Sequence, residues 1–231
     1  LVASAQWEDP NAEVDVYKAA VGDGEGIHNP WITPKQDDEG HYVFDGQAVH
    51  DTTGATGNAL LAAKNGETVV NKGTLWVIGT GNGEAMVNHT GQNGTIINDA
   101  EGTIYVTGSS TDKNKAMAVN PGGTAINYGK IVVKDKASGL LDGSANPGQD
   151  PAKKMINNGT IEVVGNGVGI NYRMEGGDAV EVSNTGDIFV TGSGTGVQLI
   201  AGKDGEAYEN KNFTNTGNIE ASGDDSTAVD I

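Results

Sequence analysis

The chain contains no cysteine, which excludes a disulfide framework and any metal or redox site built on thiolates. Aromatic residues make up only 5% of the 231 residues, and signals for helices are poor. No apolar run is long enough to span a bilayer, so we expect no membrane insertion of this segment and no cofactor held by cysteine. A cysteine-free chain also suits export through an oxidising periplasm in an unfolded state, because no premature disulfide can form.

Basic residues are also scarce, with 14 Lys and Arg against 31 Asp and Glu and a formal net charge of -17. Nucleic acids and anionic membranes need a basic stripe, so we expect neither as a partner. Sulfated glycosaminoglycans are disfavoured for the same reason, unless a local basic patch forms from Lys153, Lys154, Arg173 and Lys203. The plain interpretation of the charge is solubility of an extracellular chain.

Catalytic and metal-binding motifs are missing from the sequence. It has no Gly-x-Ser-x-Gly, no His-Glu-x-x-His and no repeated calcium nonapeptide, and its four histidines show no ligand spacing. The single arginine, Arg173, has Glu175 and Asp178 nearby, which leaves a polysaccharide-degrading enzyme as the alternative function. We predict no enzyme activity, no catalytic residue, no metal site and no cofactor.

Glycine is abundant, with 36 residues, and much of it belongs to one phrase that occurs six times. The phrase is an apolar pair, Asn, one or more residues, Gly, a variable residue, then Ile or Leu, any residue, and Val or Ala. Its copies are 71–77, 98–106, 127–133, 157–163, 184–190 and 215–221. The repeated glycines stand 27 to 31 residues apart, the period of a solenoid whose repeats bury apolar surface against their neighbours. We interpret the glycines as residues that tight turns need at strand ends.

Each repeat carries three short apolar runs: one before the Asn, one after the Gly and one about ten residues later. Three strands per repeat predict an all-β fold, a right-handed, single-stranded parallel β-helix whose three-stranded rungs lie about 4.8 Å apart. Alternation points one pair of each middle strand inward: Leu75/Val77, Ile104/Val106, Ile131/Val133, Ile161/Val163, Ile188/Val190 and Ile219/Ala221. The repeated Asn is predicted to form a structural ladder at the corner between the first two strands.

Outward positions of the middle strands form columns and are the first candidate binding strip. One column contains Thr74, Thr103 and Thr160, and its neighbour contains Trp76, Tyr105, Glu162 and Phe189. Tryptophan and tyrosine anchor many interfaces, although cross-strand packing or cover by an N-terminal cap explains these aromatic residues equally well. The second candidate is a corner loop around Tyr172 and Arg173, because long insertions gather at that corner in 142–154, 171–178 and 201–212.

The two ends of the chain depart from the repeat. Residues 1–45 are predicted to cap the first rung, with Trp7 and Trp31 as candidate plugs, and residues 46–231 to form the rungs. Ala3-Ser4-Ala5 resembles a signal-peptidase site, so 1–5 is interpreted as a possible remnant of a signal peptide. Because the chain stops within a third-strand pattern, we expect a truncated piece of a longer solenoid.

The phrases Ile156-Asn157-Asn158-Gly159-Thr160-Ile161-Glu162-Val163 and Ser183-Asn184-Thr185-Gly186-Asp187-Ile188-Phe189-Val190 resemble the passenger domains of Gram-negative autotransporter adhesins. The resemblance covers roughly residues 58–231. It implies a right-handed β-helix on the bacterial cell surface, exported through the periplasm and tethered by a C-terminal barrel absent from this sequence. It further implies self-association in biofilm, or attachment to a host matrix protein or glycan, through a lateral face of the β-helix.

Overall fold

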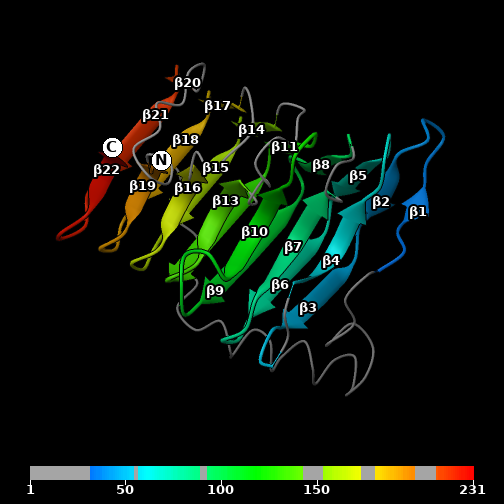
Figure 1. Cartoon of the computed structure of the whole chain (residues 1–231), viewed down its shortest axis with the longest axis horizontal. Coiled ribbons are helices and arrows are strands. Elements are labelled where there is room, and N and C mark those ends of the chain that lie inside the picture. Colours follow the sequence, from blue (N-terminus) through cyan, green and yellow to red (C-terminus); the bar gives the residue numbers. More distant parts are fainter. Residues whose placement is uncertain (1–31, 55–56, 89–92, 143–152, 173–179, 201–211) are drawn as a thin grey trace.

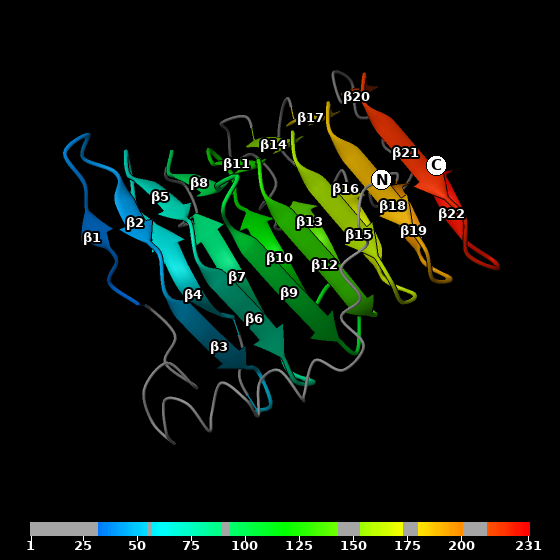
Figure 2. The same cartoon turned by 180° about the vertical axis from the view of Figure 1, so that it is seen from behind.

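The computed structural model describes residues 32–54, 57–88, 93–142, 153–172, 180–200 and 212–231. These residues form 22 strands in three sheets and no helix, so none of them provides an apolar helix that could cross a membrane. The sheets run side by side along one long axis (Figures 1 and 2). Most of the predicted cap, including Trp7 and Trp31, and the tripeptide Ala3-Ser4-Ala5 lie outside the described residues.

Each sheet collects one strand from every repeat. The first sheet contains β1 (Lys35–Gln36), β2 (Tyr42–Phe44), β5 (Thr68–Asn71), β8 (Thr95–Asn98), β11 (Thr124–Asn127), β14 (Lys153–Asn157), β17 (Val180–Asn184) and β20 (Asn212–Asn215). The second contains β3 (Gln47–Asp51), β6 (Thr74–Ile78), β9 (Thr103–Gly108), β12 (Lys130–Asp135), β15 (Thr160–Val163), β18 (Asp187–Val190) and β21 (Asn218–Ala221). The third contains β4 (Asn58–Ala63), β7 (Gly83–Asn88), β10 (Asn114–Val119), β13 (Ser138–Asp142), β16 (Val168–Tyr172), β19 (Thr195–Leu199) and β22 (Thr227–Asp230).

Neighbouring strands within each sheet are parallel, except that β1 pairs antiparallel with β2. The chain therefore visits the three sheets in turn and then returns to the first, one strand further along. This arrangement confirms the predicted parallel β-helix with three strands per rung. The hairpin of β1 and β2 closes one edge of the first sheet, so part of the predicted cap already belongs to the first rung.

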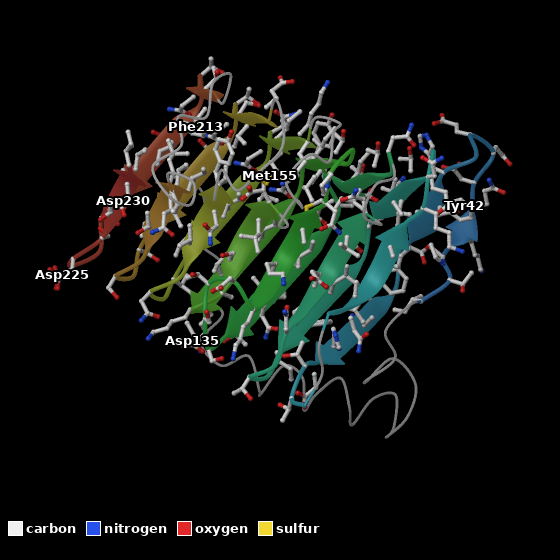
Figure 3. The ribbon with its side chains drawn as sticks, viewed as in Figure 1. Tyr42, Asp135, Met155, Phe213, Asp225 and Asp230 are labelled. Atoms are coloured by element: carbon white, nitrogen blue, oxygen red, sulfur yellow. The ribbon has the colours of Figure 1, made fainter. Side chains whose placement is uncertain are left out.

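The interior is one continuous apolar core along the axis. The predicted inward pairs of the second sheet are confirmed. Leu75, Val77, Ile104 and Val106 are completely buried, and so are the later pairs up to Val190. The first sheet contributes residues such as Met155, and Tyr42 and Phe213 pack against the core from strands at opposite ends of this sheet (Figure 3). Stacking of like residues on successive rungs gives each repeat its apolar contacts.

The predicted asparagine ladder runs along the corner after the first sheet. Each Nδ2 donates to the Oδ1 of the equivalent Asn one rung further on, over 2.8–2.9 Å. The ladder consists of Asn71, Asn98, Asn127, Asn157, Asn184 and Asn215. The same amides bond backbone carbonyls of the turn, for example Asn98 to Gly102 and Lys130. These bonds satisfy buried polar groups that would otherwise destabilise the corner.

The repeated glycines have a different cause from the one predicted. None of the six has a positive φ, so conformational freedom does not require them. A Cβ at Gly159 would lie closer than 3.0 Å to the carbonyl oxygen of Gly129, and a Cβ at Gly186 would meet that of Gly159 in the same way. Glycine is needed here because consecutive rungs approach each other too closely for a side chain.

Candidate functional site

The first predicted column lies on the outer face of the second sheet as expected. Register places Thr74 beside Thr103, then Lys130, Thr160, Asp187 and Asn218 on successive strands. Gln47 precedes them on β3. Every one of these side chains is exposed or half-buried. We call this set of seven residues the polar column.

The neighbouring column, for which the sequence left both a contact strip and cross-strand packing open, is packed at Trp76. Trp76 is only 6% exposed and belongs to a cluster with Val49, Ile78 and Val132. Tyr105 packs against this cluster, and its ring stacks on that of Trp76 with centroids 5.8 Å apart. Of the two interpretations left open for Trp76, the structure supports cross-strand packing. Whether the cap adds cover lies outside the described residues.

Glu162, in the same column, is also buried, with 4% of its surface exposed. Its Oε2 lies 4.0 Å from Nζ of Lys130 in the polar column. Burial raises the pKa of the Glu162 carboxyl, and the charge of Lys130 opposes this rise. Glu162 is thus a poor candidate for direct contact with a partner.

The outer face becomes more open toward the last rungs. Phe189 is half-buried beside Glu162, and Glu220, its neighbour on β21, is exposed. Of the predicted aromatic column, Phe189 and Tyr105 keep partly exposed rings, and their role in binding stays a prediction.

The second candidate region is corrected at Tyr172. This residue ends β16 and pairs with Leu199 on β19, and its side chain is completely buried in the core. Its hydroxyl finds no hydrogen-bond partner among the described residues, and burial, followed by the charge of Asp142, raises its pKa well above the usual value. Tyr172 is therefore a core residue rather than an exposed loop residue. Arg173 lies outside the described residues.

The possible basic patch is also contradicted where it can be seen. Lys153 is 2% exposed, and its Nζ lies 3.8 Å from Oδ2 of Asp142. Lys154 is exposed but lies 3.8 Å from Glu181. Arg173 and Lys203 lie outside the described residues. The two visible lysines thus face carboxylates.

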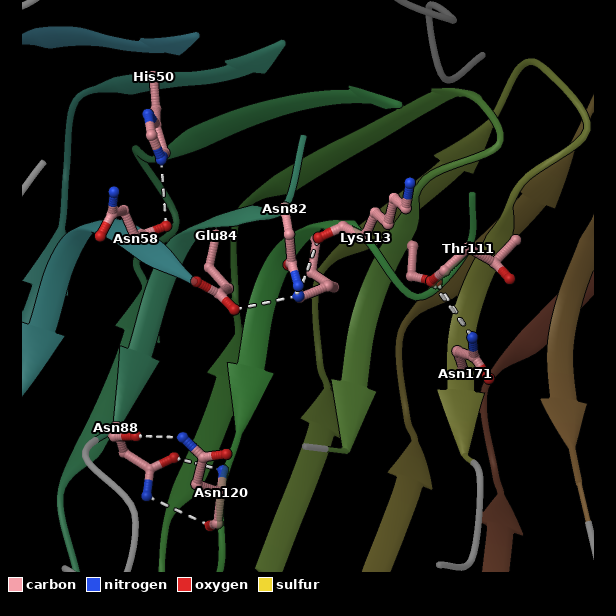
Figure 4. Close-up of polar contacts among 11 residues, drawn as sticks. His50, Asn58, Asn82, Glu84, Asn88, Thr111, Lys113, Asn120 and Asn171 are labelled. Carbon is pink, nitrogen blue, oxygen red and sulfur yellow. Dashed lines mark hydrogen bonds and ion pairs between the residues drawn. The ribbon is translucent and has the colours of Figure 1, made fainter. Parts of the chain in front are cut away.

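The outer face of the third sheet carries a network of polar side chains that is largely buried. Lys115 Nζ lies 3.0 Å from Oε1 of Glu84 and donates to Oδ1 of Asn82 and the backbone oxygen of Lys113 (Figure 4). Asn171 donates over 3.4 Å to the backbone oxygen of Thr111, in the turn after β9 (Figure 4). Because Glu84, Lys115 and Asn171 are buried, their charged and amide groups are closed to a ligand.

The outer face of the first sheet carries a feature that the sequence analysis missed. Aliphatic side chains at one outward position of five consecutive strands are in register: Val43, Val70, Ile97, Ile126 and Ile156. We call them the aliphatic ladder. Val70 is 6% exposed, and the other four are half-buried. The apolar pair before each Asn was the available signal, since alternation turns one member of such a pair outward.

A surface cavity of about 460 Å³ lies at the β1–β2 end of this ladder. Val43, Val70 and Ile97 contribute its apolar lining, and Tyr128, 45% exposed, lines it as well. The remaining lining residues are polar or charged: Asp37, Asp38, Glu39, His41, Lys72 and Asp99. We call this cavity the acidic groove.

The turn between β1 and β2 is held in place by Asp37. Its Oδ1 accepts hydrogen bonds of 2.9 Å from the backbone nitrogens of both Glu39 and His41. Asp37, Glu39 and His41 also bring potential metal-ligating atoms within 4.8 Å of one another, the one such group among the described residues. One oxygen of the Asp37 carboxylate is engaged by the turn, and all three residues line the cavity, so we assign them to the wall of the groove.

Comparison of the chain with protein-family models, with curated proteins and with solved structures found no match. The fold and the surfaces described above are therefore the basis for function.

Proposed function

We propose that the chain is an adhesive segment of a surface protein of the autotransporter type, and that it binds a partner through the polar column without turning over a substrate. The observation that supports this most is the column itself. It extends over the seven strands of the second sheet in unbroken register, and none of its side chains is buried. At the usual rung spacing, seven strands span about 29 Å.

A rigid column of this kind favours binding by many small contributions. A single hydrogen bond from a hydroxyl or amide adds only about 0.5–1.5 kcal/mol net. Equal spacing lets one partner engage several rungs, and many copies on one cell multiply the effect through avidity. The proposed consequence is attachment of cells to one another or to a host surface protein or glycan.

Salt dependence separates the two kinds of partner. Two copies with a formal net charge of -17 repel each other, and added salt screens that repulsion. Self-association is therefore strengthened by salt, whereas attachment to a basic host partner is weakened. Aggregation of displaying cells measured at low and high salt distinguishes these cases.

The direct experiment removes hydroxyls from the column without changing its shape. The triple variant Thr74→Val, Thr103→Val, Thr160→Val should reduce cell aggregation or ligand capture at equal surface display. A matched control is Thr68→Val, Thr95→Val, Thr124→Val, because these half-buried threonines occupy the first sheet. Equal loss of adhesion in both triples, or none in either, contradicts the assignment to the polar column.

The rival proposal of polysaccharide cleavage depended on Arg173 and its acidic neighbours, which lie outside the described residues. Turnover of acidic or neutral polysaccharides by the purified chain, abolished in Arg173→Ala or Asp178→Asn, would favour the enzyme instead.

A further inference from the structure

We infer that the acidic groove is a second binding site, on a different sheet from the polar column, and that it takes an extended peptide segment of a partner in which an aliphatic side chain stands between arginines or lysines. The inference does not depend on the adhesive function, because it rests on another face of the molecule.

The apolar part of the groove lining offers a contact surface for an aliphatic side chain of the ligand. Val43, Val70 and Ile97 occupy the same outward position on three neighbouring strands. Val43 and Ile97 remain half-buried, so part of this apolar surface is open to solvent. Three strands span about 10 Å, which is the length of about three residues of extended chain. A single aliphatic side chain of a short extended segment therefore fits this lining.

The charged residues of the groove favour a ligand with positive charge. Four carboxylates line it, from Asp37, Asp38, Glu39 and Asp99, against one lysine, Lys72, and His41. Asp38 and Glu39 are exposed, and Asp99 is half-buried. Cationic groups are attracted to such a concave acidic surface, whereas anionic ligands are repelled.

Tyr128 gives the groove an aromatic surface. Its equivalents on other rungs, the residues that follow the ladder asparagines, are Lys72, Asp99, Asn158, Thr185 and Thr216. An exposed ring beside carboxylates is a favourable surface for a guanidinium or ammonium group, which interacts with the face of the ring. Together with the apolar lining, it favours a peptide over a simple cation.

The test titrates the ¹⁵N-labelled chain with acetyl-Arg-Leu-Arg-amide and follows backbone amide shifts. Perturbations should centre on Val70, Ile97 and Asp99, and affinity should fall as salt is added. Acetyl-Glu-Leu-Glu-amide and acetyl-Arg-Ser-Arg-amide should each bind at least about tenfold more weakly, since one loses the charge match and the other the apolar contact. Equal binding of all three peptides, or shifts centred elsewhere, overturns the inference.

Two variants test the groove residues separately. Asp38→Asn with Asp99→Asn should weaken binding of acetyl-Arg-Leu-Arg-amide about tenfold. Asp224→Asn with Asp230→Asn makes the same change in net charge at exposed acids of the last rung and should leave affinity unchanged. Ile97→Thr should weaken binding, whereas Ile156→Thr, in the aliphatic ladder beyond the groove, should not.

The last part of the experiment titrates the chain with calcium chloride. If calcium shifts the Asp37–Glu39 turn while the arginine peptide binds neither there nor at Ile97, the groove is a cation site and the peptide proposal is wrong. If the control variants weaken binding as much as the groove variants, the interaction is nonspecific charge attraction, which also overturns it.

Discussion

Asn127 donates a hydrogen bond of 2.8 Å from Nδ2 to Oδ1 of Asn157, and both side chains are completely buried. Asn127 Nδ2 also lies within hydrogen-bond distance of the carbonyl oxygens of Gly129 and Thr160. One amide thus joins two rungs and their turns. Removing it leaves several buried polar groups without a partner, which is costly in a dry interior.

We therefore predict that Asn127→Ala and Asn157→Ala each lower the free energy of unfolding by about 1–3 kcal/mol. Urea unfolding followed by circular dichroism measures the loss. Asn218→Ala, an exposed asparagine on β21, is the matched control and should change stability by less than about 0.5 kcal/mol. Equal stability of all three variants would contradict a structural ladder.

The ladder and the inward pairs could be predicted because the repeat puts the same residue type at the same place on every rung. Leu75, Ile131 and Ile161 occupy the same place in their repeats, and each is followed two residues later by a valine, which identifies both the strand and the side that faces the core. The local sequence pattern was sufficient to predict these residues, because each rung contacts only its neighbours.

Exposure of the outer faces could not be predicted in the same way. Alternation shows that Trp76 points away from the axis, but it does not show that Val49, Ile78 and Val132 bury it. At Tyr172 the error was one of strand length, since β16 continues two residues past Ile170 and alternation then turns Tyr172 inward. The acidic groove could not be predicted because its residues come from the β1–β2 hairpin and from the ends of β5, β8 and β11 on successive rungs.

Trp76 is predicted to stabilise the fold, in contrast to Phe189. Trp76→Ser should cost about 3–5 kcal/mol, because it removes a buried ring from a packed cluster and its stack with Tyr105. Phe189→Ser removes a half-buried ring and should cost only about 1–2 kcal/mol. Thermal melts of the two variants decide the point, and equal melting temperatures would show that Trp76 is not a packing residue.

Gly159→Ala is predicted to be destabilising by at least about 1–3 kcal/mol, because the added methyl forces the rung away from the Gly129 carbonyl. Gly46→Ala is a fitting control, since the nearest atom that its Cβ would meet is in the ring of Phe44, 3.3 Å away. A melt in which both variants match the parent chain would mean that rung spacing adjusts freely.

The last prediction concerns the buried ion pair of Lys115 and Glu84, 3.0 Å apart. Burial raises the pKa of Glu84 above its ordinary value near 4.5, and the charge and hydrogen bond of Lys115 partly counter that rise. A carboxyl with a raised pKa binds its proton more tightly in the folded chain. Its contribution to stability is therefore full below the ordinary pKa and is lost as pH rises through the raised value.

Lys115→Met removes the attraction that holds the Glu84 pKa down, so the pKa should rise further. At pH 7 the variant must bury an unpaired carboxylate or protonate it, and we expect a loss of about 3–5 kcal/mol. The loss should shrink as pH falls, because Glu84 is then protonated in both chains. Urea unfolding across a pH series measures this, and Glu84→Gln with Lys115→Met should show little of the pH dependence.

Lys154→Met, which breaks the exposed pair with Glu181, should cost no more than about 1 kcal/mol at any pH. A Lys115→Met penalty that is equally large throughout the pH series would indicate lost packing of the lysine stem rather than an unpaired carboxylate.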